Sequence, residues 1–351
     1  MSELTITNCH IHLFNIDHVP NGYLPLGLMR ALRQPYIRTP LIWVLRQGIF
    51  WREGDVGERA ARFADIGRMG SQKEIFDVVS GYYPRGTRFI VLPMDMAFMK
   101  RGKPPKEIRE QHDELAELAR DAEGAVIPFA AIDPRRENVL DELKRCRDKG
   151  FRGVKLYPPL GYRPDDKVLM DDIYPYCLEN GLPIMSHCSR GGVRQRNLSN
   201  SEQEKLASPA AFRAVLERFP ELHVCLAHFG GDQDWNDYLG PPHRRPSSGR
   251  DEFRRNNWLT QILDMLRSEQ YPNLWTDISY TAFEFQQNVP VLNIFLNEKK
   301  ILNRVLFGSD FYMTEIAKVS ERRVSMELRH GIGDDKFRQI AHVNPDVYLN
   351  P

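Results

Sequence analysis

"LTITNCHIHLF" (residues 4–14) is the first of eight short apolar runs along the chain. The runs are almost continuously apolar, which is typical of strands buried on both faces of a parallel sheet. The others are residues 88–96, 125–133, 151–158, 182–188, 222–230, 273–280 and 304–312. This pattern predicts eight strands.

Segments with helical periodicity separate these runs. Apolar residues recur at helical spacing in 111–122 and 137–148, and in 208–219 Ser208 stands where a helix cap belongs, followed by Pro209. Repeated strand–helix alternation without a break in composition predicts one domain over residues 1–351, a (β/α)8 TIM barrel. The alternative, a doubly wound open sheet, lacks a Gly-x-Gly-x-x-Gly after its first strand.

Two stretches are longer than a minimal barrel requires. Residues 15–87 separate the first two runs, and residues 231–257 form a polar stretch rich in Pro, Gly and Arg after the sixth run. We expect both to be insertions at the carboxyl ends of their strands, the second as a loop, where active sites and lids are built. The aromatic segment 35–51 is predicted to cover the barrel mouth or to contact another subunit.

Composition excludes several classes of protein. The 351 residues carry 48 basic and 47 acidic side chains, a net charge of +1, which argues against nucleic acid or a membrane surface as the main partner. The five cysteines are scattered and show no Cys-x-x-Cys spacing, as in cytoplasmic proteins with free thiols. No apolar run approaches the ~18 residues of a membrane span, and the start of the chain does not look like a secretory signal. We expect a cytoplasmic protein with a small-molecule substrate; homo-oligomerisation stays open.

His10 and His12 stand two residues apart in the first run. In a strand their imidazoles share one face, which suits two ligands of one metal ion, although a pair of hydrogen-bonded core histidines would look the same. Later runs add metal-ligand residue types near their carboxyl ends, which a barrel brings to one face. These are Lys155, His187, His228 and Asp310.

The order of these residues resembles the amidohydrolase superfamily. The phrases "CHIHLF", "AIDP", "GVKLYPP", "AHFGG" and "LFGSDF" are similar to its "amidohydrolase 2" group, metal-dependent TIM-barrel hydrolases related to amino-carboxymuconate-semialdehyde decarboxylase. The resemblance extends from about residue 4 to residue 345. It is specific for the superfamily and says little about the substrate.

The resemblance implies one of two ligand sets. In one-metal members the ligands would be His10, His12, His187 and Asp310, with His228 left as an acid–base or carbonyl-polarising group. In two-metal members a carboxylated Lys155 would bridge the ions and His228 would join His187 on the second. A salt-bridged or substrate-binding Lys155 stays an open alternative. Such ligands favour Zn, with Mn, Fe or Co also acceptable.

The resemblance implies a metal-dependent hydrolase that cleaves a C–N or C–O bond (amide, ester or lactone) of a small, carboxylated substrate, with Asp310 and His228 as catalytic residues. Lys155 favours hydrolysis, since related decarboxylases typically lack it. One alternative is a non-oxidative decarboxylase of an aromatic or muconate-type acid. Another is an inactive barrel that acts as a binding protein.

Three further residues lie near the predicted site. Arg190 follows His187 by three positions and Tyr157 ends the fourth run, so both are predicted to bind substrate. A solvated loop arginine and a packed tyrosine are the simpler alternatives. Asp277 in the seventh run could hold a ligand histidine by a hydrogen bond, or serve as a buried structural carboxylate.

Overall fold

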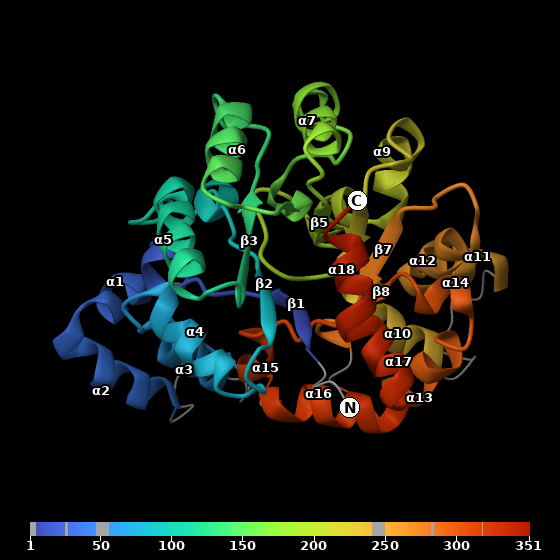
Figure 1. Ribbon diagram of the computed structural model, residues 1–351. Coiled ribbons are helices and arrows are strands. Elements are labelled where there is room, and N and C mark those ends of the chain that lie inside the picture. The colour runs from blue at the N-terminus through green and yellow to red at the C-terminus, as the bar shows by residue number, and fades with distance from the viewer. Residues whose placement is uncertain (1–4, 25–26, 47–55, 241–249, 282–283, 318) are drawn as a thin grey trace.

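Figure 1 shows the computed structural model, which describes residues 5–24, 27–46, 56–240, 250–281, 284–317 and 319–351. Eight parallel strands stand side by side in chain order, which confirms the predicted TIM barrel. Each strand is shorter than its apolar run, because the run continues beyond the strand at the carboxyl end and, in most cases, at the amino end as well. The strands are β1 (Thr7–Ile11), β2 (Arg88–Val91), β3 (Val126–Ala131), β4 (Gly153–Leu156), β5 (Ile184–Ser186), β6 (Val224–Leu226), β7 (Leu274–Asp277) and β8 (Val305–Leu306).

The barrel closes between its first and last strands. β8 pairs with β7 through two residue pairs only, and a single parallel bridge joins Ile11 to Phe311. Backbone hydrogen bonds complete the closure: Cys9 N donates to Phe307 O (2.8 Å) and Asp310 N donates to His10 O (2.9 Å). Residues from the two ends of the chain are therefore neighbours at the carboxyl end of the barrel.

Helices surround the strands (Figure 1). They are α1 (Leu28–Arg33), α2 (Pro35–Arg46), α3 (Val56–Gly67), α4 (Gln72–Ser80), α5 (Ile108–Asp121), α6 (Val139–Asp148), α7 (Tyr174–Glu179), α8 (Asn200–Ala207), α9 (Arg213–Arg218), α10 (Asp232–Leu239), α11 (Arg250–Asn256), α12 (Trp258–Arg267), α13 (Phe285–Phe295), α14 (Lys299–Leu302), α15 (Met313–Ile316), α16 (Glu321–Ile332), α17 (Asp334–Arg338) and α18 (Asn344–Tyr348).

The predicted helices agree with this list apart from one detail. Residues 111–122 and 137–148 fall in α5 and α6, and 208–219 form a 3-10 turn followed by α9. Ser208 precedes that turn without capping it, because its hydroxyl donates to Lys205 O of α8 (3.2 Å).

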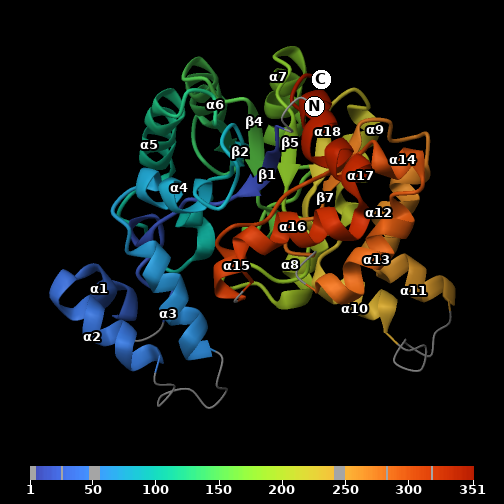
Figure 2. The same cartoon turned by 60° about the horizontal axis from the view of Figure 1, so that its bottom comes forward.

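The insertion after β1 contributes α1 to α4. Figure 2 shows α1, α2 and α3 to one side of the barrel, where α2 packs on its two neighbours. Tyr36 and Trp43 on α2 are 94% and 62% exposed. The proposed lid or subunit contact of segment 35–51 stays a prediction, and its residues 47–51 lie outside the described part of the chain.

The insertion after β6 differs from the predicted loop. Its described residues form the helices α10 and α11, while 241–249 lie outside the description. Trp235 explains the helical start: its ring is buried and its indole N–H donates to Phe229 O (3.0 Å). The same ring packs edge-on against Phe295 of α13, with centroids 5.8 Å apart, and this contact with a distant helix gives order to a segment whose composition is polar.

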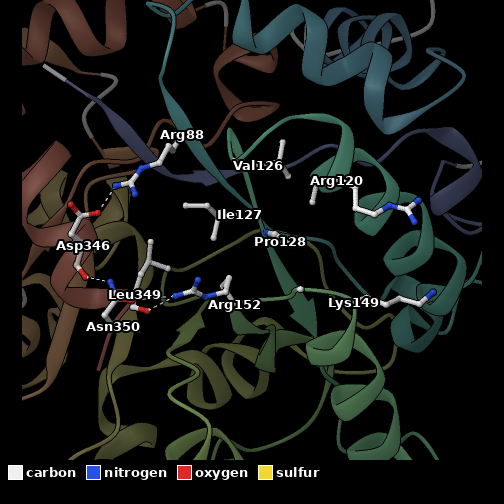
Figure 3. Close-up of a pocket in the computed structure, with 13 residues that line it drawn as sticks. Arg88, Arg120, Val126, Ile127, Pro128, Lys149, Arg152, Asp346, Leu349 and Asn350 are labelled. Atoms are coloured by element: carbon white, nitrogen blue, oxygen red, sulfur yellow. Dashed lines mark hydrogen bonds and ion pairs between the residues drawn. The ribbon is translucent and has the colours of Figure 1, made fainter. Parts of the chain in front are cut away.

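The last turn of α18 closes the amino end of the barrel. Tyr348 is buried, its hydroxyl donates to Ile184 O (2.8 Å), and His223 Nδ1 lies 3.1 Å from its carbonyl oxygen. A cleft of about 510 Å³ lies beside it, at the amino ends of β2, β3 and β4. Figure 3 shows the guanidinium groups of Arg88 and Arg152 turned towards this C-terminal segment. The cleft is at the opposite end from the predicted site.

All five cysteines are buried and free, as the sequence predicts. Among the described helices, none has the length and apolar character needed to cross a membrane.

Candidate metal centre

The six predicted ligand residues gather at the carboxyl ends of five strands. His10 and Lys155 lie within β1 and β4, and His12 and His187 directly follow β1 and β5. His228 and Asp310 lie two and four positions after the ends of β6 and β8. None of the six is more than 6% exposed. Few places in a protein bury this many polar side chains without a function or a bound group.

Two residues at the carboxyl end of β7 hold the ring of His10. Its Nδ1 lies 2.9 Å from Asp277 Oδ2 and 3.1 Å from Ser279 Oγ. Because the carboxylate can only accept, Nδ1 carries the proton, and Nε2 presents a lone pair to the centre of the site. Asp277 thus makes the predicted hydrogen bond to a candidate ligand.

His12 has the same tautomer for a different reason. Its Nδ1 donates to Leu92 O (2.7 Å), since a backbone carbonyl can only accept. Its Nε2 is therefore unprotonated and lies 3.4 Å from Asp310 Oδ1. Burial, with the nearby charge of Lys155, lowers the pKa of His12 to about 3, so this imidazole is neutral at physiological pH.

His187 and His228 form the other side of the cluster. His228 Nε2 lies 3.0 Å from His187 Nδ1, and His228 Nδ1 lies 2.9 Å from Ser279 Oγ. The ring centroids of His10 and His228 are 4.8 Å apart, which links the two halves of the site. Burial lowers the pKa of both His187 and His228, so that both are available as neutral ligands or hydrogen-bonding groups.

Lys155 and Asp310 are the charged members of the site. Burial lowers the pKa of the Lys155 ammonium and raises the pKa of the Asp310 carboxyl. The Lys155 Nζ atom is fully enclosed and makes no hydrogen bond to any residue that the structure describes. A buried amine without a hydrogen bond is costly even near the charges of Asp277 and Asp310, so this atom calls for a partner.

Two of these residues adopt strained backbone conformations. His228 has φ = 70° and Asp310 has φ = 57°, in the left-handed region that residues with a side chain rarely occupy. Such conformations persist where the surrounding structure enforces them, and they cluster at functional sites.

The residues fit a divalent metal ion. One nitrogen each of His10 and His12 and one oxygen of Asp310 lie within 4.8 Å of one another, all buried. Of these donors, His10 Nε2 and Asp310 Oδ1 have no hydrogen-bond partner among the described residues. A mixed imidazole and carboxylate donor set is that of zinc and related ions.

The comparison with known families agrees with this geometry. The model of the amidohydrolase family Amidohydro_2 matches residues 7–346. The chain belongs to this family. Among curated proteins, none matches the sequence.

Solved structures with the same fold include amidohydrolase-like enzymes of three reaction types. A probable 2-pyrone-4,6-dicarboxylic acid hydrolase from Acinetobacter baumannii is 12% identical (TM-score 0.56) over 98% of this chain and 99% of that one. The 5-carboxyvanillate decarboxylase of Sphingomonas paucimobilis is 12% identical (TM-score 0.57) over 99% of both chains. The 4-oxalomesaconate hydratase of Rhodopseudomonas palustris is 14% identical (TM-score 0.55) over 98% and 95%. At these identities the likeness concerns the fold, and the reaction has to be argued from the site.

The two predicted substrate-binding residues of this amidohydrolase are engaged within the protein. The Arg190 guanidinium pairs with Asp234 and Glu204 (2.8 Å each) and lies 4.6 Å from the Trp258 ring centroid. The Tyr157 ring stacks on His187, with centroids 4.5 Å apart. Its hydroxyl accepts from Val193 N (2.9 Å). Substrate binding by either residue stays a prediction.

Ser279 is a site residue that the sequence reasoning missed. Its hydroxyl bridges the Nδ1 atoms of His10 and His228. It stands two positions after Asp277, so the two-residue period of a strand end could have pointed to it. The Leu92 carbonyl that orients His12 carries no such signal, because every residue has one.

Proposed function

We propose that this amidohydrolase is a metal-dependent hydrolase that cleaves a C–N or C–O bond of a small, carboxylated molecule. The observation that carries the proposal is Lys155, a buried amine beside the candidate ligands that has no hydrogen-bond partner among the described residues. Burial favours its neutral form, which is the form that reacts with carbon dioxide to give a carbamate. The carbamate oxygens would join an ion held by His10, His12 and Asp310 to one held by His187 and His228.

A bound divalent ion supplies an activated water molecule, whose pKa it lowers towards ~7, and a positive charge that polarises the substrate carbonyl. Asp310 is the residue of this chain that can accept the proton of that water and pass it to the leaving nitrogen or oxygen. Burial raises the pKa of its carboxyl, which makes the carboxylate a better proton acceptor. Where one ion is bound, His228 is not a ligand, and its imidazole would donate a hydrogen bond to the substrate carbonyl oxygen in place of its contact with His187.

A second candidate function is non-oxidative decarboxylation. It is favoured by the close group of His10, His12 and Asp310, which with His187 offers a complete ligand set for one ion without Lys155. In this reaction the bond between the carboxylate carbon and the substrate breaks and carbon dioxide leaves. His228 or Asp310 then delivers a proton to the carbon that keeps the electron pair.

Elemental analysis of protein purified without chelators, with intact-mass detection of a carbamate on Lys155, tests the proposal. A two-ion centre with a modified lysine supports the hydrolase. A single ion with an unmodified lysine supports the decarboxylase. Protein that takes up no ion after addition of Zn²⁺ or Mn²⁺ contradicts both and favours a binding protein.

A Lys155→Ala variant separates the two reactions further. The hydrolase proposal expects it to lose the second ion and the hydrolysis of carboxylated amides, esters or lactones. The exposed Lys205 provides the control, since Lys205→Ala leaves the metal ligands untouched. Release of carbon dioxide from aromatic acids by both variants would support the decarboxylase instead.

A further inference from the structure

Asn8 connects the two parts of the chain that carry the first and last candidate ligands. Its Oδ1 accepts from the backbone N–H of His10 (3.2 Å) and of Ser309 (3.1 Å). Its Nδ2 donates to Ser309 Oγ (2.8 Å) and to Tyr83 Oη (3.0 Å). The amide is fully buried, and both its oxygen and its nitrogen are used twice.

The same network reaches outward to the insertion and to α16. The Tyr83 hydroxyl accepts from Asn8 and therefore directs its own proton to Glu321 Oε1, at 2.7 Å. Tyr83 belongs to the segment that precedes β2, and Glu321 is the first residue of α16. The direction of every hydrogen bond is thus determined, which gives Asn8 a single orientation.

The turn that Asn8 holds is packed directly against His10. A Cβ atom on Gly308 would lie 2.8 Å from His10 Cβ, so this position has no room for a side chain. On the other side of Ser309, Asp310 N donates to His10 O (2.9 Å). The contact between Asn8 and Ser309 therefore acts together with these two contacts to hold His10 and Asp310 in position relative to each other.

We infer that Asn8 is a positioning residue that sets the geometry between His10 and Asp310 and thereby the affinity of the site for its metal ion. It touches neither ion nor substrate and acts through the backbone of His10 and of Ser309, the residue before Asp310. The inference rests on the metal site of the proposed function. Removal of hydrogen bonds that orient metal ligands lowers metal affinity by roughly 10- to 100-fold.

The test measures metal affinity and stability separately. The Zn²⁺ affinity of the full chain is obtained by competition with a chromophoric chelator, and the ligand geometry from the visible absorption spectrum of the Co²⁺ form. Asn8→Ala should weaken Zn²⁺ binding by at least ~10-fold and change the Co²⁺ spectrum. Asn8→Asp keeps the oxygen that accepts from both backbone amides and should restore most of the affinity.

Two further variants distinguish a specific loss of metal affinity from a general loss of folding. Tyr83→Phe removes one acceptor of the Asn8 amide and retains the ring, so it should fold and give a smaller loss of Zn²⁺ affinity. Asn344 is the matched control, a buried asparagine whose Nδ2 donates to Val305 O (2.6 Å) at the amino end of β8. Asn344→Ala should lower the unfolding temperature and leave Zn²⁺ affinity unchanged.

The outcomes distinguish this inference from the proposed function. If the unmodified chain binds neither Zn²⁺ nor Co²⁺, the proposed metal site is wrong. If the unmodified chain binds both ions, and Asn8→Ala and Tyr83→Phe bind them with the same affinity and spectrum, the positioning role of Asn8 is wrong. A loss of affinity in Asn344→Ala equal to that in Asn8→Ala would also overturn it, because the effect would then follow stability alone.

Discussion

His10 Nδ1 lies 2.9 Å from Asp277 Oδ2, and both side chains are completely buried. The other oxygen of the same carboxylate accepts from the backbone N–H groups of His228 and Ser279 (3.0 Å each). One carboxylate thus fixes the ring of one candidate ligand and the backbone of another. It also makes His10 a stronger electron donor to a metal ion.

Asp277→Asn tests this relationship. The substitution preserves shape, but one half of the amide can no longer accept, so either His10 or the His228 backbone loses its partner. We expect Zn²⁺ affinity to fall by roughly 10- to 100-fold. Chelator competition measures it, and circular dichroism monitors the fold. Native affinity in a folded variant would assign Asp277 a purely structural role.

Replacement of a ligand should remove the metal and leave the fold. We expect His12→Ala and Asp310→Ala to be purified with little or no metal and still to unfold cooperatively, because each removes a polar group from the mouth of the barrel. His223 serves as control, a largely buried histidine at the amino end of the barrel. Elemental analysis should find full metal content in His223→Ala. Full metal content in either ligand variant would contradict the assignment.

The metal-free protein should lose stability as the pH falls. Burial lowers the pKa of His10, His12, His112, His187 and His228 below the ordinary histidine value of about 6.5. Above that value the buried histidines make their full contribution to the free energy of unfolding. The contribution is lost as the pH falls below it, because the unfolded chain then binds more protons than the folded one. For each such histidine the free energy of unfolding falls by about 1.4 kcal/mol per pH unit.

Urea denaturation at several pH values between 7.5 and 5.5, in the presence of a chelator, measures this dependence. His12→Asn should make the dependence of the free energy of unfolding on pH less steep, by the contribution of one histidine. A free energy of unfolding that stays constant over this range would show that the buried histidines do not control acid stability.

Replacement of Arg190 by alanine distinguishes a structural role of this residue from a role in substrate binding. Its partner Asp234 is almost completely buried, and Arg190→Ala would leave that carboxylate without its cation. We expect a loss of roughly 3 kcal/mol in the free energy of unfolding. Arg194→Ala, in the same loop, is the control. A folded Arg190→Ala protein of unchanged stability with a raised KM would instead support the substrate-binding prediction.

The barrel and the ligand positions could be predicted because both follow local patterns. A strand buried on both faces reads as an apolar run, and a polar side chain at its end, such as His187 or Asp310, stands out against that background. The eight strands and the buried His/Asp cluster therefore agree with the sequence.

The supporting role of Asn8 could not be predicted because its partner is distant in sequence. Asn8 bonds to Ser309, 301 positions away. Asp277, which bonds to His10 over 267 positions, could be proposed because a carboxylate stands out in a buried strand. In the sequence, Asn8 is one polar residue in a strand without a visible counterpart. The helices α10 and α11 were missed for a related reason, since Trp235 anchors α10 against Phe295 of α13, a contact that composition does not reveal.

The closure of the barrel has a kinetic consequence. The seam between β8 and its neighbours contains two residue pairs towards β7 and one bridge towards β1, and the candidate ligands His10, His12 and Asp310 lie across it. An ion held by these three residues would join the two sides of the seam, so opening of the seam would favour its release. The rate at which excess chelator removes the metal would therefore report how often the barrel opens at this seam, and the measurement needs no substrate.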